Sequence, residues 1–346
     1  IEHLFVASTH AYLLFLTTTG KVRWQKVYDL PQLARDSKGR AIVNLLNLEP
    51  DEKIAECLAV RDFDQEGYYV VMATRSGLVK KTPLEQYSRP KRGGIIAIKL
   101  REGDELVDAA VVGPGDEVIL VTASGMAIRF RESDARPMGR NTSGVKGISL
   151  VGDDRVVGMV VADPDATLLT VCENGYGKRT TFGPNASAGG DGDEGSEEST
   201  SSSSRYRTQK RGGKGLRDIR TSDRNGEVIG IARVNDEDEI FMMTAKGKIQ
   251  RIKAGDINVI GRNTQGVRIM NVDQGDSLIA VVRVPPEEAA EEEAVVGEAT
   301  GDAESGTTES GTTEPGQSSA DSISPDSSDA EVDTPDADPE SDDSTE

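Results

Sequence analysis

Residues that build metal sites, disulfides and membrane spans are scarce in this chain. Its 346 residues include two cysteines, Cys57 and Cys172, with no C-x-x-C pair, and two histidines, His3 and His10. Neither a structural zinc site nor a disulfide framework is expected from so few ligands, and the sparse cysteine is consistent with a reducing compartment. No apolar run reaches the length of a membrane span, and no signal-peptide pattern is visible. We therefore expect a cytoplasmic protein with no membrane contact and no metal or other cofactor of its own.

Aromatic residues make up only 4% of the chain, so a surface that stacks on single-stranded bases is not favoured. Positive charge is also in deficit overall, since the formal net charge is −20. That deficit of positive charge arises in one part of the chain, its C-terminal segment. The segment 285–346 holds 21 of the 60 acidic residues and none of the 40 Lys and Arg, which leaves a net charge of about +1 for 1–284. This tail, and the acidic Ser/Gly-rich insertion 186–204, cannot bury enough apolar surface to order themselves, so both are predicted to be disordered.

Five segments of 1–284 share one plan: an apolar strand, a turn at a glycine, and a second strand that acquires positive charge. Each is predicted to be a β-hairpin, because glycine supplies the positive φ that such turns need. A second glycine follows at a fixed interval, 19 residues in three of the five units, and the acidic insertion interrupts the fourth unit. The segments are 12–24, 68–81, 116–130, 166–180 and 238–252.

Units of roughly 50 residues with four strands each predict an all-β, propeller-like ring of sheets with five recognisable repeats. An ordinary β-sandwich with coincidental turns is the alternative. It does not account for GRNTSGVKG (139–147) and GRNTQGVRI (261–269), which are identical at six of their first eight positions. The repeat architecture is therefore the interpretation we adopt. The first strand pattern begins directly at Ile1 with no methionine, so the chain is expected to be a fragment that lacks an upstream part.

Positive charge recurs at equivalent repeat positions, which predicts a row of cations on one rim of the ring. One set stands four residues after the turn glycine, and another lies in the loop before the second glycine. Evenly spaced cations suit a long polyanion, and duplex DNA held by its backbone is the expected ligand. The candidate residues are Lys81, Arg129, Arg179 and Arg251 in the first set, and Arg35, Lys38, Arg40, Arg89, Lys91, Arg92, Arg140 and Arg262 in the second.

The segment 209–215, QKRGGKG, combines glycines that allow a close backbone approach with cations that can hold phosphate. It is not a Walker loop, because no Ser or Thr follows its lysine. It closely resembles the box motif of the DNA gyrase A C-terminal domain. Similar strings run through nearly all of 1–284, among them ATRSGLVKKT (73–82), NGYGKRT (174–180) and the two GRNT segments. The box adds candidate DNA-binding residues Gln209, Lys210, Arg211, Gly212, Gly213, Lys214 and Gly215.

The resemblance implies a β-pinwheel, a propeller-like disc whose four-stranded blades exchange strands with their neighbours. It implies a nucleoid-associated domain that wraps duplex DNA so that an ATP-dependent type II topoisomerase introduces negative supercoils. The implied partners are gyrase B and the N-terminal cleavage domain of gyrase A, in an A2B2 complex that uses ATP and Mg²⁺. The family's usual box lies in its first blade, whereas here the complete copy is in the fourth unit. No tyrosine here lies in a winged-helix context, so no catalytic residue is expected and the isolated fragment should be inactive.

Two other assignments remain open from the sequence. The homologous C-terminal domain of topoisomerase IV steers substrate choice without full wrapping and has degenerate boxes, whereas QKRGGKG is intact. A propeller that serves as a protein-interaction scaffold would present apolar or mixed rim patches, whereas the rim positions here are mostly Lys and Arg.

Overall fold

Short antiparallel strands form nearly all of the regular structure. The computed structural model describes residues 7–34, 37–91, 93–185 and 204–286. Within these residues the only α-helix is α1 (Val43–Leu46), and 3-10 turns follow the second strand of four hairpins. These turns are η1 (Val27–Asp29), η2 (Leu84–Tyr87), η3 (Glu132–Asp134) and η5 (Ala254–Asp256).

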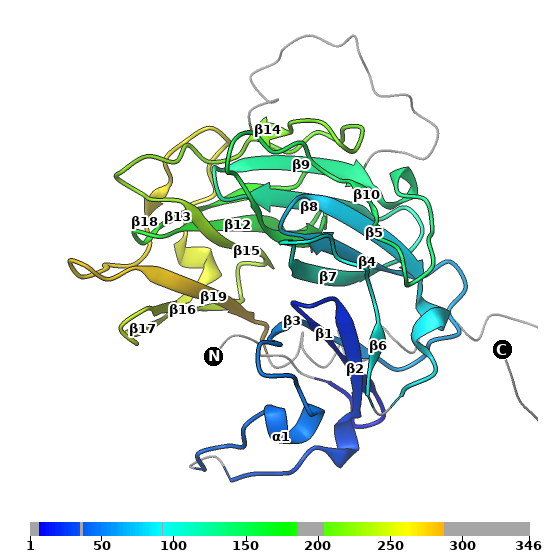
Figure 1. The fold of residues 1–346 in the computed structure, drawn as a ribbon. Helices are drawn as coiled ribbons and strands as arrows, with labels where there is room; N and C mark the ends of the chain where they lie inside the picture. Colours follow the sequence, from blue (N-terminus) through cyan, green and yellow to red (C-terminus); the bar gives the residue numbers. More distant parts are fainter. Residues whose placement is uncertain (1–6, 35–36, 92, 186–203, 287–346) are drawn as a thin grey trace, which may run out of the picture. The chain divides into compact units, whose positions relative to one another are not determined.

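The strands group into five sheets, which we number as blades 1 to 5 in chain order (Figure 1). From the innermost strand outward, blade 1 contains β3 (Ile54–Val60), β1 (Tyr12–Thr17), β2 (Lys21–Lys26) and β6 (Ile95–Ile96). Blade 2 contains β7 (Leu106–Val112), β4 (Tyr69–Thr74), β5 (Leu78–Pro83) and β10 (Val145–Lys146). Blade 3 contains β11 (Val156–Val161), β8 (Glu117–Thr122), β9 (Met126–Arg131) and β14 (Leu216–Arg217). Blade 4 contains β15 (Val228–Val234), β12 (Thr167–Cys172), β13 (Tyr176–Thr181) and β18 (Val267–Arg268). Blade 5 contains β19 (Leu278–Val284), β16 (Glu239–Thr244) and β17 (Ile249–Lys253).

The innermost strands pack against one another in the order β3, β7, β11, β15, β19, so the described residues form a five-bladed β-propeller. In blades 1 to 4 the outermost strand comes from the following repeat: β6, for example, lies in the second repeat but pairs with β2 of blade 1. The exchange of strands between neighbouring blades is thus confirmed.

The five predicted hairpins are all present, each within two residues of its expected bounds. Each four-stranded unit needs two strands besides its hairpin, and these two differ in length and in the sheet they join. The first of them has only two residues, begins directly after the glycine and belongs to the preceding blade's sheet. In the first repeat, residues 37–42 form no strand, and α1 follows instead.

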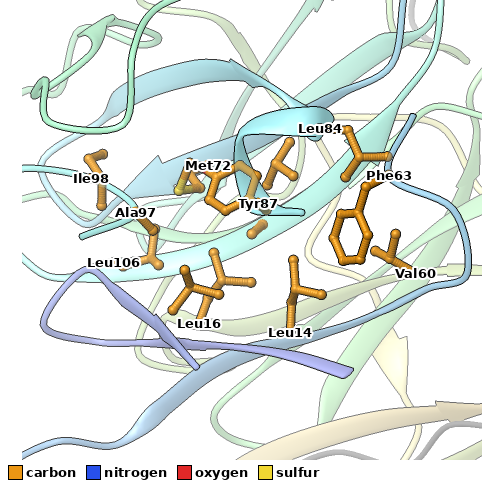
Figure 2. Close-up of a cluster of buried hydrophobic side chains, with 13 residues drawn as sticks. Leu14, Leu16, Val60, Phe63, Met72, Leu84, Tyr87, Ala97, Ile98 and Leu106 are labelled. Atoms are coloured by element: carbon orange, nitrogen blue, oxygen red, sulfur yellow. The ribbon is translucent and has the colours of Figure 1, made fainter. Parts of the chain in front are cut away.

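The hydrophobic core lies between consecutive blades. Figure 2 shows the cluster between blades 1 and 2, with Leu14 and Leu16 of β1 on one side and Met72 of β4 and Tyr87 on the other. Similar clusters join blade 2 to blade 3, blade 3 to blade 4, and blade 4 to blade 5. Each blade therefore buries its apolar faces against its neighbours, which is how repeat proteins build a continuous core from units too small to have one.

The second glycine of the repeat is required where the outermost strand meets its new sheet. Gly215 has φ +77°, and a Cβ there would overlap the carbonyl oxygen of Ala127 in β9. Gly144 has φ +86° and would meet Val79 of β5 in the same way. Only glycine combines this backbone conformation with so close an approach, which explains why the sequence repeats it.

The chain before the acidic insertion lies close to the insertion's last residue, because the Thr181 hydroxyl donates to the carbonyl oxygen of Ser204 at 3.1 Å. The predictions of disorder for the insertion and the tail concern residues that, apart from Ser204, Pro285 and Pro286, lie outside the described part of the chain. No helix among the described residues is long and apolar enough to cross a membrane.

Candidate nucleic-acid interface

Four segments that carry the outermost strands follow one another along the outside of blades 1 to 4. We call them together the outer strip; they are 91–99 (without Arg92, which is not among the described residues), 139–149, 209–217 and 261–268. Backbone hydrogen bonds link the first three in succession: Lys99 N–H donates to Thr142 at 3.0 Å, and Gly212 N–H donates to Gly147 at 2.6 Å. The fourth segment is linked through Asp218, the residue that directly follows the third segment. Asn263 N–H donates to the Asp218 carbonyl oxygen at 2.7 Å. The strip is therefore a continuous surface built from four repeats.

The outer strip contains Lys and Arg in every segment and no Asp or Glu in any of them. The second residue of each outermost strand is exposed while the first is half-buried. Three of these second positions are cations, Lys146, Arg217 and Arg268, and the fourth is Ile96. Because the positions are equivalent in their sheets, the three charged side chains project from the same face of successive blades.

Five exposed cations of the outer strip have no acidic partner among the described residues. Within the described residues no carboxylate lies within 4.0 Å of Lys146, Arg217, Arg268, Lys210 or Lys214. Some exposed cations elsewhere do pair with acids, as in Arg75–Glu105 and Arg155–Glu227. These five side chains thus carry positive charge that no ion pair in the described chain neutralises, which favours the binding of a polyanion.

The box segment contributes backbone contacts that hold blades 2 and 3 together. Gln209 N–H donates to Arg129 O at 2.8 Å, and the Ser149 hydroxyl and N–H donate to Gly212 O and Gly213 O at 2.7 and 2.8 Å. The Arg211 guanidinium donates to the carbonyl oxygens of Asp134 (3.0 Å) and Lys146 (2.7 Å). Arg211 is therefore a structural contact between the outer segments of two blades.

The box lysines remain available. Lys210 and Lys214 are exposed and have no hydrogen-bond or ion-pair partner among the described residues. The side-chain amide nitrogen of Gln209 is buried and likewise finds no acceptor there. Within the box, the free charge that could meet phosphate belongs to the two lysines.

The prediction that Lys81, Arg129 and Arg179 lie on an exposed rim is wrong. Their residues are 4%, 1% and 3% exposed, because each side chain reaches the loop after the second strand of the next blade. Lys81 binds Glu132, and Arg179 binds Asp236 and donates to Ile257 O at 2.8 Å. These three cations recur because consecutive blades need the same contact.

Arg129 makes the most extensive of these contacts. Its Nε lies 2.5 Å from Glu117 Oε2, and its Nη1 donates to Phe182 O at 2.6 Å and Tyr206 O at 3.1 Å. It therefore fixes the two chain segments on either side of the acidic insertion. Burial lowers the pKa of Arg129, an effect that Glu117 partly offsets.

The other predicted DNA-binding residues divide by location. Lys91, Arg140 and Arg262 lie in the outer strip, Lys91 exposed and the two arginines half-buried, and burial lowers the pKa of Arg262. Arg89 is exposed just before the strip, and Lys38 and Arg40 are exposed before α1, where no outermost strand forms. Arg251 is exposed in β17 and pairs with Glu239. Arg35 and Arg92 lie outside the described residues.

Sequence reasoning missed the cations two residues past the second glycine, Lys146, Arg217 and Arg268. The sequence feature that could have identified them is their constant distance from the second glycine, in G-V-K, G-L-R and G-V-R. A second such feature is the absence of acidic residues from the surrounding segments.

It also missed two fully buried lysines, Lys80 and Lys178. Lys178 is paired with Asp218 at 2.6 Å, and the hydroxyls of Tyr206 and Thr170 donate to the same carboxylate at 2.5 and 2.7 Å. Among the described residues, Lys80 Nζ donates to the carbonyl oxygens of Ala97 and Arg140, the latter at 2.5 Å, so it ties the first two segments of the strip together. Burial, with a smaller contribution from the Arg140 charge, lowers the pKa of Lys80 to about 7.

Lys80 predicts a stability that rises with pH. Between its folded pKa of about 7 and its ordinary value of 10.5, the unfolded chain binds a proton that the folded chain lacks. Unfolding then takes up a proton, so the free energy of unfolding increases by up to about 1.4 kcal/mol per pH unit in that window. Urea unfolding at about pH 7.5 and 8.5 measures the increase, and Lys80→Met should remove it. Equal pH dependence in the two proteins would contradict the assignment.

Comparison with known proteins identifies the class. The family model described as "DNA gyrase C-terminal domain, beta-propeller" matches residues 11–61, 68–113, 116–163, 201–235 and 238–285. The chain belongs to this family of DNA gyrase C-terminal β-propeller domains. The DNA gyrase A protein of Klebsiella oxytoca is 40% identical over 292 residues, which is 84% of this chain and 31% of that protein. The corresponding gyrase A of Mycolicibacterium smegmatis is 40% identical over 294 residues, 84% of this chain and 32% of that one. The chain thus spans about a third of the length of these relatives.

Two solved structures share the fold at 26% sequence identity. One is a DNA gyrase A C-terminal domain, with a TM-score of 0.65 over 81% of this chain and 84% of that one. The other is the C-terminal domain of a DNA topoisomerase IV, with a TM-score of 0.69 over 83% of both chains. The structures alone do not separate these two relatives, whereas the curated relatives cited above are gyrase proteins.

Proposed function

We propose that this chain is a DNA-wrapping domain of gyrase type, which binds duplex DNA along the outer strip and bends it over successive blades. The supporting observation is the strip itself: cations without ion pairs at equivalent positions on blades 2 to 4, in segments that contain no Asp or Glu. Contacts of this kind are to phosphates and carry little sequence information. Binding should weaken steeply with salt, by about 0.9 log units per log unit of salt for each phosphate neutralised.

The wider role proposed for the domain follows from its family. In an assembly with the cleavage domain of gyrase A and with gyrase B, the bent segment would be presented for strand passage and negative supercoiling. ATP and Mg²⁺ would be bound by those other parts. No group of three or more potential metal-ligating side chains occurs in the described chain. A nucleoid-associated location follows from DNA as the proposed ligand.

A topology assay tests wrapping directly. Closed circular plasmid is relaxed by a type I topoisomerase in the presence of the chain, and the retained linking difference is measured after protein removal. We expect a difference that grows with protein concentration and is largely lost in the Lys210→Ala/Lys214→Ala variant. That variant removes the free box charge while Arg211 and the glycines keep their contacts, and circular dichroism checks that it is folded.

The alternative assignments predict other results. A substrate-steering domain of topoisomerase IV type would bind plasmid without a matching linking difference. An interaction scaffold would show no salt-dependent binding to duplex DNA at all.

A further inference from the structure

One tyrosine on blade 4 lies between two arginines. Tyr176 is the first residue of β13, and Arg268 of β18 is its direct partner in the sheet. Arg224 reaches the same ring from the loop before β15. The guanidinium carbons lie 5.0 Å (Arg224) and 5.1 Å (Arg268) from the ring centroid, and the tyrosine is only 5% exposed. Both contacts fall in the range of cation–π interactions.

The tyrosine hydroxyl accepts from both arginines. Arg268 Nη2 donates to it at 2.8 Å and Arg224 Nε at 3.3 Å. A phenolic hydroxyl also carries one donor hydrogen. Neither contact uses that hydrogen, and no acceptor for it is found in the described part of the chain. Two guanidinium groups and one hydroxyl, all hydrogen-bond donors, therefore meet at one place, and the hydroxyl proton has no acceptor among the described residues.

Within the described part of the chain, the hydrogen-bond partners observed for the two arginine side chains are neutral groups. Besides Tyr176, Arg268 contacts the amide oxygen of Asn271 at 3.4 Å, and Arg224 contacts that of Gln265 at 3.3 Å. No carboxylate pairs with either guanidinium among the residues that the structure describes. Two like charges gathered around one hydroxyl repel each other, and an anion bound between them would remove that cost. Their hydrogen bonds, that of Arg224 first, also lower the pKa of Tyr176.

We propose that Tyr176, Arg224 and Arg268 form a phosphate-binding site that holds one phosphodiester group of duplex DNA. The inference rests on the proposed function, because Arg268 belongs to the outer strip, and it adds a particular anchoring point to it. Guanidinium groups already fixed by the ring lose less conformational freedom on binding than free lysines do. The equivalent positions of the other hairpins carry Lys21, Leu78, Met126 and Lys248, so among these hairpins the tyrosine is particular to blade 4.

The test uses the full chain labelled with ¹³C at the tyrosine ζ carbons, so that the pKa of Tyr176 can be followed by NMR. The Tyr176→Phe variant assigns the resonance. Inorganic phosphate is the first probe and linear duplex DNA the second. We expect each to raise the pKa of Tyr176, because the bound anion opposes formation of the phenolate. Arg268→Gln should abolish the phosphate effect and reduce the salt slope of DNA binding by about 0.9.

Affinity measurements separate the hydroxyl from the charges. Tyr176→Phe should weaken duplex binding several-fold with an unchanged salt slope, because it removes a donor and no charge. The matched control is Tyr28→Phe, since the Tyr28 hydroxyl also accepts from a cation, Lys26 Nζ at 2.9 Å, on blade 1. That control should bind DNA like the unmodified chain, and an equal loss in it would contradict a specific role of Tyr176.

The remaining outcomes decide separate points. If neither phosphate nor duplex changes the Tyr176 resonance, the site is overturned. If phosphate changes it but a duplex that binds the chain does not, the DNA phosphodiester is the wrong ligand. If phosphate changes it and the chain binds no duplex, the proposed DNA function fails while the anion site stands.

Discussion

Replacing Lys146, Arg217 and Arg268 together by glutamine should weaken duplex DNA binding by about 10²- to 10³-fold at 0.1 M salt. Each is an exposed cation on the outermost strand of its blade, with no acidic partner among the described residues. Loss of three phosphate contacts should also reduce the slope of log K against log salt by about 2.7. Fluorescence anisotropy with a labelled duplex, repeated over a salt series, measures both quantities.

A matched triple variant separates this local effect from net charge. Arg75→Gln, Arg155→Gln and Lys246→Gln together remove the same charge from positions outside the outer strip. There Arg75 and Arg155 already pair with Glu105 and Glu227. We expect little change in affinity and almost none in the salt slope. A loss equal to that of the first triple would mean that the chain binds DNA through its overall charge, and the outer strip would not be the interface.

The hairpins and their order could be predicted from sequence because their determinants are local. An apolar strand, a turn glycine and a returning strand lie within about fifteen residues, and the repeat supplies five independent copies. The outermost strands could not be predicted in the same way. A strand such as Val145–Lys146 has two residues and is defined only by its pairing with β5, more than sixty residues earlier in the chain.

The cations show a second limit of sequence reasoning. Lys81, Arg129 and Arg179 repeat as regularly as Lys146, Arg217 and Arg268, and periodicity alone does not say which set is exposed. The acid that pairs with Lys81 is Glu132, 51 residues away. The distinguishing feature was the composition around each set. Acidic residues flank the hairpins and can neutralise the first set, whereas the outer segments contain none.

Arg129→Met should cost about 3–5 kcal/mol of stability, the largest effect we expect from a single substitution. Arg129 is 1% exposed and its partner Glu117 is 0% exposed, so the substitution leaves a buried carboxylate without its charge partner. The carbonyl groups that Arg129 holds on both sides of the insertion lose their donor as well. Thermal and urea unfolding measure the loss, and the double variant Glu117→Gln/Arg129→Met should recover part of it because neither charge of this buried pair then remains.

Arg251→Gln is the matched control for Arg129→Met, because Arg251 occupies in blade 5 the repeat position that Arg129 occupies in blade 3. Its side chain is 59% exposed and its pair with Glu239 is at the surface, so the expected loss of stability is below about 1 kcal/mol. Arg129→Met protein that is kept folded at low temperature should bind duplex DNA with nearly unchanged affinity and salt slope. A reduced slope with unchanged stability would instead make Arg129 a phosphate contact. A large stability loss in Arg251→Gln would mean that the shared repeat position, and not burial between blades, determines the effect.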